Sequence, residues 1–319
     1  MTGPKPRSEL RKDYIQDKYV IIAPRRAARP QPPACPPPGP PAGKDCDFCP
    51  ESGRQPEDIA TVGPARAWRL KVKRNRYPAV TGDNPRAYGR QEVIIETPRH
   101  DQRLEELSLA NIVELFDVFA DRTRAISADP RIEYILIFKN TVGGAGASLG
   151  HSHCQIFATD FIPPHLLDKS EKILEYRLRC GRCPYCDVIA RESAGPRLVW
   201  RDRQVVVFAP YASMYNYELW ILPRRHFDNV TDMDQAEKKS WARALKAALA
   251  AVRRLGLPYN FYFHQVKHDT DQHLYMKITP RGSVWAGVEI GSGVIINPVA
   301  PEAAARYFRR EFRAAGLTS

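Results

Sequence analysis

Cysteines and histidines recur in the same order in the two halves of the sequence, spaced like the ligands of a metal ion. Each set begins with a Cys-x-x-Cys pair and continues with a histidine after a Pro-Arg step and a second histidine further on. The residues are Cys46, Cys49, His100 and His151 in the first half and Cys183, Cys186, His226 and His273 in the second. Thiolates and imidazoles in sets of four are the ligands that tetrahedral zinc prefers. The sequence therefore predicts two zinc sites, each closed by four protein ligands and structural in role.

The second cysteine pair has one alternative. Cys180 lies three residues before Cys183, so these two could also form the pair. An aromatic residue precedes the second cysteine in both halves, Phe48 in the first and Tyr185 in the second. This match favours Cys183 and Cys186 as the ligands.

The segment from Asn140 to Gln155 carries the densest chemistry. Its glycines let backbone amides approach an anion closely. In the strand that follows, His151, His153 and Gln155 face one side because side chains alternate. His151 is assigned to zinc, which leaves His153 as a candidate nucleophile toward phosphorus and Gln155 as an uncharged donor to a phosphate oxygen. The alternative interpretation of His153 is an ordinary core histidine.

The second half supplies an internal comparison for this segment. Alignment on the predicted zinc ligands sets His273 against His151, Tyr275 against His153 and Lys277 against Gln155. The metal ligand is kept, while the proposed nucleophile and phosphate donor are replaced. This difference favours chemistry over packing as the role of His153.

The elements that must position these residues follow from the hydrophobic periodicity. Apolar runs and alternations predict strands at residues 68–72, 92–96, 134–138, 205–208, 218–222, 260–263 and 274–278. Apolar residues at helical spacing predict a helix over residues 108–127, with Ser108 as its N-cap, and another over 234–255 that ends at Gly256. A final amphipathic helix is expected at residues 302–315.

Strands interrupted by one long helix, twice over, predict an α+β protein built by tandem duplication. Each half is expected to be an antiparallel sheet with a long helix, and the two halves are expected to pack as a pseudo-dimer. The predicted halves are residues 1–168 and 169–319, with the join near 163–175. A length of 319 residues is enough for two such units.

Composition excludes several classes of protein. No stretch reaches the ~18 apolar residues of a membrane span, and no apolar signal core precedes the first half, so we expect a cytoplasmic protein with no membrane partner. Seven cysteines, four of them in metal-type pairs, fit a reducing compartment. The net charge of +12 is spread along the chain, which suits either a solvated surface or attraction of a polyphosphate substrate. A zinc-stapled nucleic-acid binder would need clustered basic residues with exposed aromatics between them, and these are not evident.

The His-x-His-x-Gln segment, with Asn140 and Ser148 before it, resembles the galactose-1-phosphate uridylyltransferase branch of the histidine-triad superfamily. Further segments that carry this resemblance are Glu9–Asp13, Arg26–Pro30, Asn75–Pro78, Glu96–His100, Gly287–Gly293 and Ile296–Pro298. The resemblance implies that His153 takes a UMP group from UDP-glucose, forms a covalent nucleotidyl-histidine, and passes the group to a hexose 1-phosphate, with galactose 1-phosphate expected. It also implies a homodimer, across which Arg26 and Arg29 contact the phosphates, and further substrate contacts from Asn75, Asn140, Gly146, Ser148, Glu289 and Asn297.

Two departures from the family pattern keep alternatives open. Ser152 and Cys154 stand where the uridylyltransferase motif has proline and a small residue. Serine at the first position is closer to relatives that act as adenylyl-sugar phosphorylases, so ADP-glucose or a diadenosine polyphosphate is the alternative donor. Some members bind iron in the second half through histidines and a glutamate, whereas the cysteine pair here favours a second zinc. A hydrolase of the same superfamily usually has a further histidine where Gln155 stands, so the glutamine favours transfer.

Overall fold

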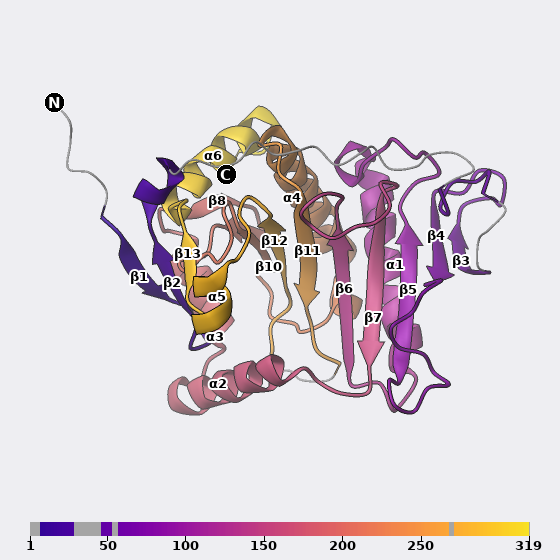
Figure 1. Ribbon diagram of the computed structural model, residues 1–319, viewed down its shortest axis with the longest axis horizontal. Helices are drawn as coiled ribbons and strands as arrows, with labels where there is room; N and C mark the ends of the chain where they lie inside the picture. Colours follow the sequence, from indigo (N-terminus) through magenta and orange to yellow (C-terminus); the bar gives the residue numbers. More distant parts are fainter. Residues whose placement is uncertain (1–6, 29–45, 53–56, 268–270, 319) are drawn as a thin grey trace.

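The computed structural model describes residues 7–28, 46–52, 57–267 and 271–318. Its main feature is an antiparallel sheet of ten strands, which crosses the whole molecule (Figure 1). The strand order is β3-β4-β5-β7-β6-β11-β12-β10-β9-β8. The strands are β3 (Asp58–Val62), β4 (Leu70–Arg74), β5 (Gly89–Ile95), β6 (Tyr134–Asn140), β7 (His153–Thr159), β8 (Leu198–Arg201), β9 (Val205–Phe208), β10 (Leu219–Pro223), β11 (Tyr259–His264) and β12 (Tyr275–Pro280).

The sheet consists of two groups of five strands, β3 to β7 and β8 to β12, which meet at the β6–β11 pair and have the same strand order. Reading from the outer edge inward, both five-strand groups have their first three strands, then the fifth, then the fourth. β6 and β11 pair antiparallel, with Phe261 opposite Lys139, so the two groups share one continuous sheet. The predicted α+β class with antiparallel sheets is confirmed.

Two long helices, α1 (Leu109–Ser127) and α4 (Gln235–Arg254), cover one face of the sheet (Figure 1). Their apolar faces form the main core with the inward side chains of the strands and with α6 (Pro301–Ala314). The predicted N-cap is confirmed, because the Ser108 hydroxyl accepts a hydrogen bond from the Asn111 amide. The helix expected at 234–255 is α4, and Gly256 follows it with φ of +67°.

The sequence patterns did not predict several elements. Residues 163–175, expected as a join, lie largely in a helix, α2 (Pro164–Cys180), which is followed by α3 (Pro184–Glu192). These two helices cover the second face of the C-terminal five strands and form a separate apolar cluster there. β3, β8 and the short helices η1 (Pro24–Ala28), η3 (Leu104–Glu106), η4 (Val230–Asp232) and α5 (Gly287–Ser292) were also missed. Short segments carry too few periods to be recognised.

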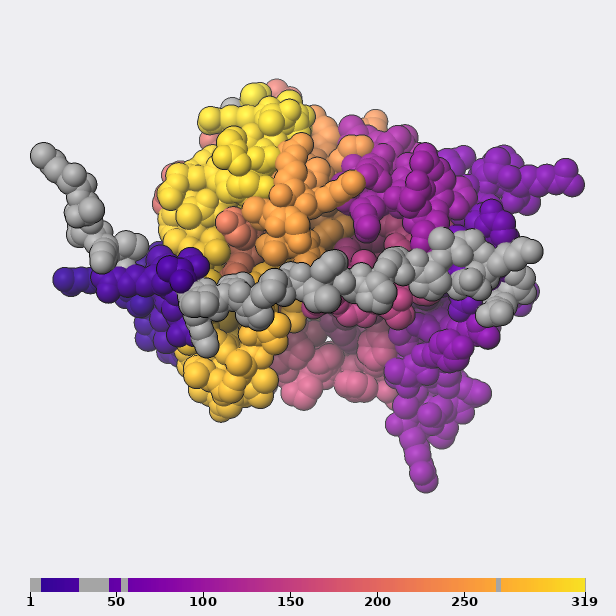
Figure 2. All heavy atoms as spheres, turned by 45° about the horizontal axis from the view of Figure 1, so that its top comes forward, coloured from indigo at the N-terminus to yellow at the C-terminus, as the bar shows by residue number. Residues whose placement is uncertain are grey.

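A second, three-stranded sheet joins the two ends of the chain. It has the order β1-β2-β13, from β1 (Glu9–Lys12), β2 (Tyr19–Ile22) and β13 (Ile295–Asn297). In Figure 2 the indigo N-terminal strands lie against the yellow C-terminal segments. This sheet was not predicted, because its strands of three or four residues are far apart in the sequence.

In the part of the chain described here, no helix combines the length and the apolar content needed to cross a membrane.

Candidate functional site

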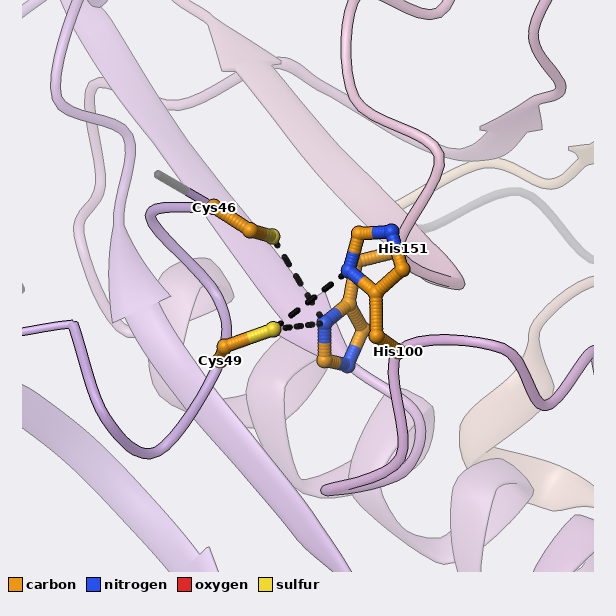
Figure 3. A group of neighbouring side chains, drawn as sticks. All are labelled: Cys46, Cys49, His100 and His151. Atoms are coloured by element: carbon orange, nitrogen blue, oxygen red, sulfur yellow. Dashed lines mark hydrogen bonds between the residues drawn. The ribbon is translucent and has the colours of Figure 1, made fainter. Parts of the chain in front are cut away.

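The first predicted metal site is assembled as expected. Cys46, Cys49, His100 and His151 point toward one another (Figure 3), and one ligand atom from each lies within 4.8 Å of the others. Cys49 Sγ lies 3.4 Å from His100 Nδ1 and 3.5 Å from His151 Nδ1. The other ring nitrogen of His151, Nε2, donates to the Thr97 carbonyl at 2.7 Å, as metal-binding imidazoles commonly do. The residues therefore fit a tetrahedral zinc ion.

The second predicted metal site brings three of its four ligands together. Cys183, Cys186 and His226 form a group within 4.8 Å among the described residues. His273 is outside this group: its Nδ1 lies 3.0 Å from the Leu274 carbonyl, although its ring centroid is 5.1 Å from that of His226. Its Nε2 is buried with no hydrogen-bond partner among the described residues. A metal beside His226 would give this unsatisfied nitrogen a partner. His273 is therefore kept as the proposed fourth ligand.

The glycine-rich loop after β6 forms an open cradle. Gly143 and Gly146 have φ of +89° and +87°, which favours glycine. A side chain added at Gly146 would meet nothing within 4 Å, so this side of the loop is open to a ligand. At the start of the loop, the side-chain Oδ1 of Asn140 accepts a hydrogen bond from Asn260 Nδ2 at 2.7 Å, which fixes the side-chain amide of Asn140. The same hydrogen bond therefore sets the direction of the Asn140 side-chain amino group. Asn260 was not recognised in the sequence.

His153 begins β7 and is oriented by its neighbours. It is only 7% exposed, and its Nδ1 donates to the His151 carbonyl at 2.8 Å. This bond fixes the tautomer that leaves the lone pair on Nε2, for which the described residues offer no hydrogen-bond partner. Burial, with Lys139 nearby, lowers the pKa of His153 to about 4. Phe48 packs edge-on at 4.9 Å between ring centroids, so the first metal loop also holds the ring.

A buried ionic network beneath this strand was missed by the sequence analysis. Lys139 Nζ lies 2.8 and 2.9 Å from the Glu96 carboxylate oxygens, and it donates to Ser152 Oγ and the His153 carbonyl at 3.0 Å each. The thiol of Cys154 also donates to Glu96, at 2.9 Å. Although burial opposes ionisation, Lys139 holds the pKa of Glu96 below its usual value.

The described residues of the C-terminal half form no such network. By strand register, Lys139 corresponds to Phe263 and Cys154 to Met276, both buried and apolar. The network is therefore confined to the half that holds the candidate nucleophile. A comparison of buried polar residues between the halves could have found it.

Gln155 and Asn75 lie on the same side of the N-terminal strands. Gln155 follows His153 by two residues in β7, so both face away from the main core. Its amide oxygen is 3.5 Å from Gln91 Nε2, and Gln91 with Asn75 lines a cavity of about 620 Å³. Ser148 is exposed in the glycine-rich loop. Of the predicted site residues, Asn140 and His153 thus line one small cavity, and Gln155 is connected to Asn75 through Gln91.

Three other predicted contacts lie elsewhere. Arg26, Glu289 and Asn297 belong to η1, α5 and β13, on the other side of β11 and β12 from β7 (Figure 1). Glu289 accepts a hydrogen bond from the Ala286 amide and caps α5. Asn297 is buried, and its amide donates to the Ser213 and Tyr215 carbonyls. Arg29 lies outside the described residues.

Known proteins similar to this chain are nucleotide-sugar enzymes. A family model described as galactose-1-phosphate uridyl transferase, N-terminal domain, matches residues 70–163. ADP-glucose phosphorylase of Arabidopsis thaliana is 30% identical over 332 residues, 94% of this chain and 92% of the relative. Galactose-1-phosphate uridylyltransferase of Thermotoga maritima is 29% identical over 328 residues, 94% and 98% of the two chains.

The solved structures agree with the sequence comparison. The crystal structure of the Arabidopsis thaliana ADP-glucose phosphorylase with bound ADP-glucose superposes with a TM-score of 0.84 at 28% identity. It covers 95% of this chain and 98% of that one. The similarity therefore extends over both five-strand groups and the small sheet.

Proposed function

Because the chain belongs to the galactose-1-phosphate uridylyltransferase family, we propose that it transfers a UMP group between UDP-glucose and a hexose 1-phosphate, with galactose 1-phosphate as the expected acceptor. His153 Nε2 attacks the α-phosphorus of UDP-glucose and forms a nitrogen–phosphorus bond. The bond from that phosphorus to the bridging oxygen breaks, and glucose 1-phosphate leaves with its electron pair. A phosphate oxygen of galactose 1-phosphate then attacks the same phosphorus and releases His153.

The observation that carries this proposal is the orientation of His153. Its Nδ1 hydrogen bond to the His151 carbonyl leaves the Nε2 lone pair unprotonated, on a residue that shares a small cavity with Asn140 and Gly150. Gly146 supplies an open backbone, and Asn140, Ser148 and Gln155 supply uncharged donors for phosphate oxygens. Uncharged donors stabilise the phosphate without withdrawing electron density from the nucleophile.

A second candidate donor is ADP-glucose, with inorganic phosphate as the acceptor. The observation in its favour is the similarity to the Arabidopsis thaliana ADP-glucose phosphorylase, at 30% identity and a TM-score of 0.84. The chemistry at His153 would be the same, and only the base and the acceptor would differ. Either reaction belongs to the nucleotidyltransferases.

Intact-mass measurement after incubation with UDP-glucose or ADP-glucose tests both reactions. We expect a uridylyl adduct on the native chain and no adduct on His153→Ala. An adenylyl adduct alone would replace the proposed donor by ADP-glucose. An adduct that persists in His153→Ala would overturn the assignment of the nucleophile.

The two cysteine–histidine clusters are proposed as structural zinc sites. Zinc would be held by Cys46, Cys49, His100 and His151 in the first, and by Cys183, Cys186, His226 and His273 in the second. The donor sets are those of closed tetrahedral sites, and zinc there would supply folding free energy. At the second site, hydrogen bonding from Cys186 lowers the pKa of Cys183 to about 4, which supplies a thiolate.

The duplication and the dimer are proposed together. The identical strand order on both sides of the β6–β11 pair supports an origin of the chain from two copies of one unit, divided between residues 1–168 and 169–319. Arg26 acts on Glu289 through space, and α5, which carries Glu289, is separated within one chain from β7, which begins at His153 (Figure 1). A homodimer in which η1 and α5 of one chain reach β7 of the other would complete the predicted site.

A further inference from the structure

The C-terminal half contains a buried basic cluster around Tyr275, the residue that stands where the first half has His153. Lys169 and Lys277 are 6% and 9% exposed. Both ammonium groups lie over the Tyr275 ring, at 4.7 and 5.9 Å from its centroid. The His264 ring stacks on the Tyr275 ring, with 4.3 Å between the two ring centroids. Two lysines and an imidazole therefore meet around one aromatic ring.

Neither buried lysine forms an ion pair with a carboxylate in the described part of the chain. Among the described residues, the hydrogen-bond partners of Lys169 Nζ are the Tyr275 hydroxyl at 3.1 Å and His264 Nδ1 at 3.4 Å. Lys277 Nζ lies 4.4 Å from the centroid of the Trp220 ring. Lysines are almost never fully buried unless paired, because removing the charge from water costs several kcal/mol.

Two carboxylates that act on Lys277, those of Asp13 and Glu218, accept hydrogen bonds from backbone amides. Asp13 accepts hydrogen bonds from the Ile15 and Gln16 amides at 3.0 Å each. Glu218 accepts from the Met214 and Tyr215 amides and from the Trp220 indole. Although burial opposes it, Tyr275, Glu218 and Asp13 raise the pKa of Lys277, so Lys169 is the lysine whose charge lacks compensation.

A hydrogen-bond donor in the cluster also lacks an acceptor. Lys169 donates to His264 Nδ1, so the proton of the neutral imidazole is on Nε2. This Nε2 is buried and has no partner among the described residues. Burial and the neighbouring Lys277 lower the pKa of Lys169 to about 7, as expected where a counter-ion is missing. The Lys169 ammonium without a carboxylate partner and the unsatisfied His264 Nε2 together indicate an absent anion.

A cavity of about 550 Å³ adjoins the cluster. Lys169 and His264 line it, and Tyr134, Ile162 and Leu166 form part of its apolar wall. This volume suits a small organic molecule better than a lone ion.

We propose that Lys169 and His264, with the charge of Lys277 behind them, form a second anion site, which binds a small phosphate monoester with its organic part against Tyr134, Ile162 and Leu166. The site is on the half of the chain that lacks the nucleophile. It does not depend on the reaction at His153.

Calorimetric titration of the full chain with glucose 1-phosphate tests the site. We expect the affinity of one class of binding sites for glucose 1-phosphate to fall at least ~10-fold in Lys169→Met and in Lys277→Met. Each substitution removes one positive charge that attracts the phosphate. Lys172→Met is the matched control on the same helix, since Lys172 is partly exposed and paired with Asp17. Ser148→Ala reports on the glycine-rich loop, and the Lys169-dependent class should survive it.

Parallel titrations identify the source of the phosphate. Inorganic phosphate that binds the Lys169-dependent class as tightly as glucose 1-phosphate would reassign the site to the free ion. Isotherms that are unchanged in both Lys169→Met and Lys277→Met, with both variants folded, would overturn the proposal. The nucleotidyl-adduct experiment does not enter this test, so failure of one leaves the other standing.

Discussion

His153 gains its orientation from residues that sequence spacing does not connect. Its own carbonyl accepts from Lys139, and its Nδ1 donates to the carbonyl of His151. Lys139 is held in turn by Glu96, from the end of the neighbouring strand. The candidate nucleophile and its phosphate donors were predicted from residue types. The Lys139–Glu96 pair was not, because it is formed by residues 43 apart that only the sheet brings together.

Lys139→Met tests whether the buried pair positions His153. We expect kcat to fall about 10- to 100-fold with little change in KM, because the peptide that orients the ring loses its donor. The variant should also lose about 3–5 kcal/mol of unfolding free energy, since Glu96 stays buried without its partner. Steady-state kinetics and denaturant unfolding measure the two effects.

The double variant Glu96→Gln/Lys139→Met separates stability from positioning. It removes both charges, so the unfolding free energy should largely recover while kcat stays low. Lys73→Met is the control, because Lys73 is a buried lysine of the same half that pairs with Asp58. Recovery of kcat together with stability would show that the pair is structural only.

At the scale of elements, long periodic segments were predicted well and short ones were not. α1, α4 and the seven strands predicted from hydrophobic runs agree with the structure within a few residues, whereas β3 and β8 were not predicted. α2 and α3 were missed because α2 buries only Lys169 and Ile173, so its apolar stripe is weak. The first metal loop was predicted from ligand spacing. Its further role, which is to pack Phe48 against His153, required the structure.

Cys49→Ser is expected to release one metal ion per chain and to lower activity as well as Tm. Loss of the metal frees the loop that carries Phe48, so His153 loses the aromatic contact at 4.9 Å. Phe48→Ala should lower activity while leaving the metal content unchanged. Elemental analysis by mass spectrometry, thermal unfolding and turnover distinguish the two variants. Full metal content in Cys49→Ser would contradict the ligand assignment.

At the scale of the whole molecule, the predicted site residues divide into two groups. The group around β7 and the group around α5 lie on different sides of β11 and β12 (Figure 1). The resemblance implied that Arg26 reaches across a dimer, but it gave no sign that Glu289 and Asn297 lie apart from β7, because their position depends on the packing of the small sheet. The separation is the physical reason to expect a second chain.

Mixing two inactive variants tests the shared site. His153→Ala and Arg26→Ala should each be inactive or strongly impaired alone, since each lacks one contribution to every site. After joint refolding or co-expression, about a quarter of the sites should contain both native residues, provided that the dimer is symmetric. Turnover that does not rise above the sum of the separate variants would exclude a site shared between chains.

The pairing of β6 with β11 has a consequence for how the protein can be divided. Cutting the chain between the two five-strand groups would leave Tyr134–Asn140 and Tyr259–His264 as bare edges, each with a row of unsatisfied amides and carbonyls. An isolated half would be driven to pair with another copy of itself through that edge. Fragments of this protein should therefore self-associate, and the intact chain should melt in a single cooperative step.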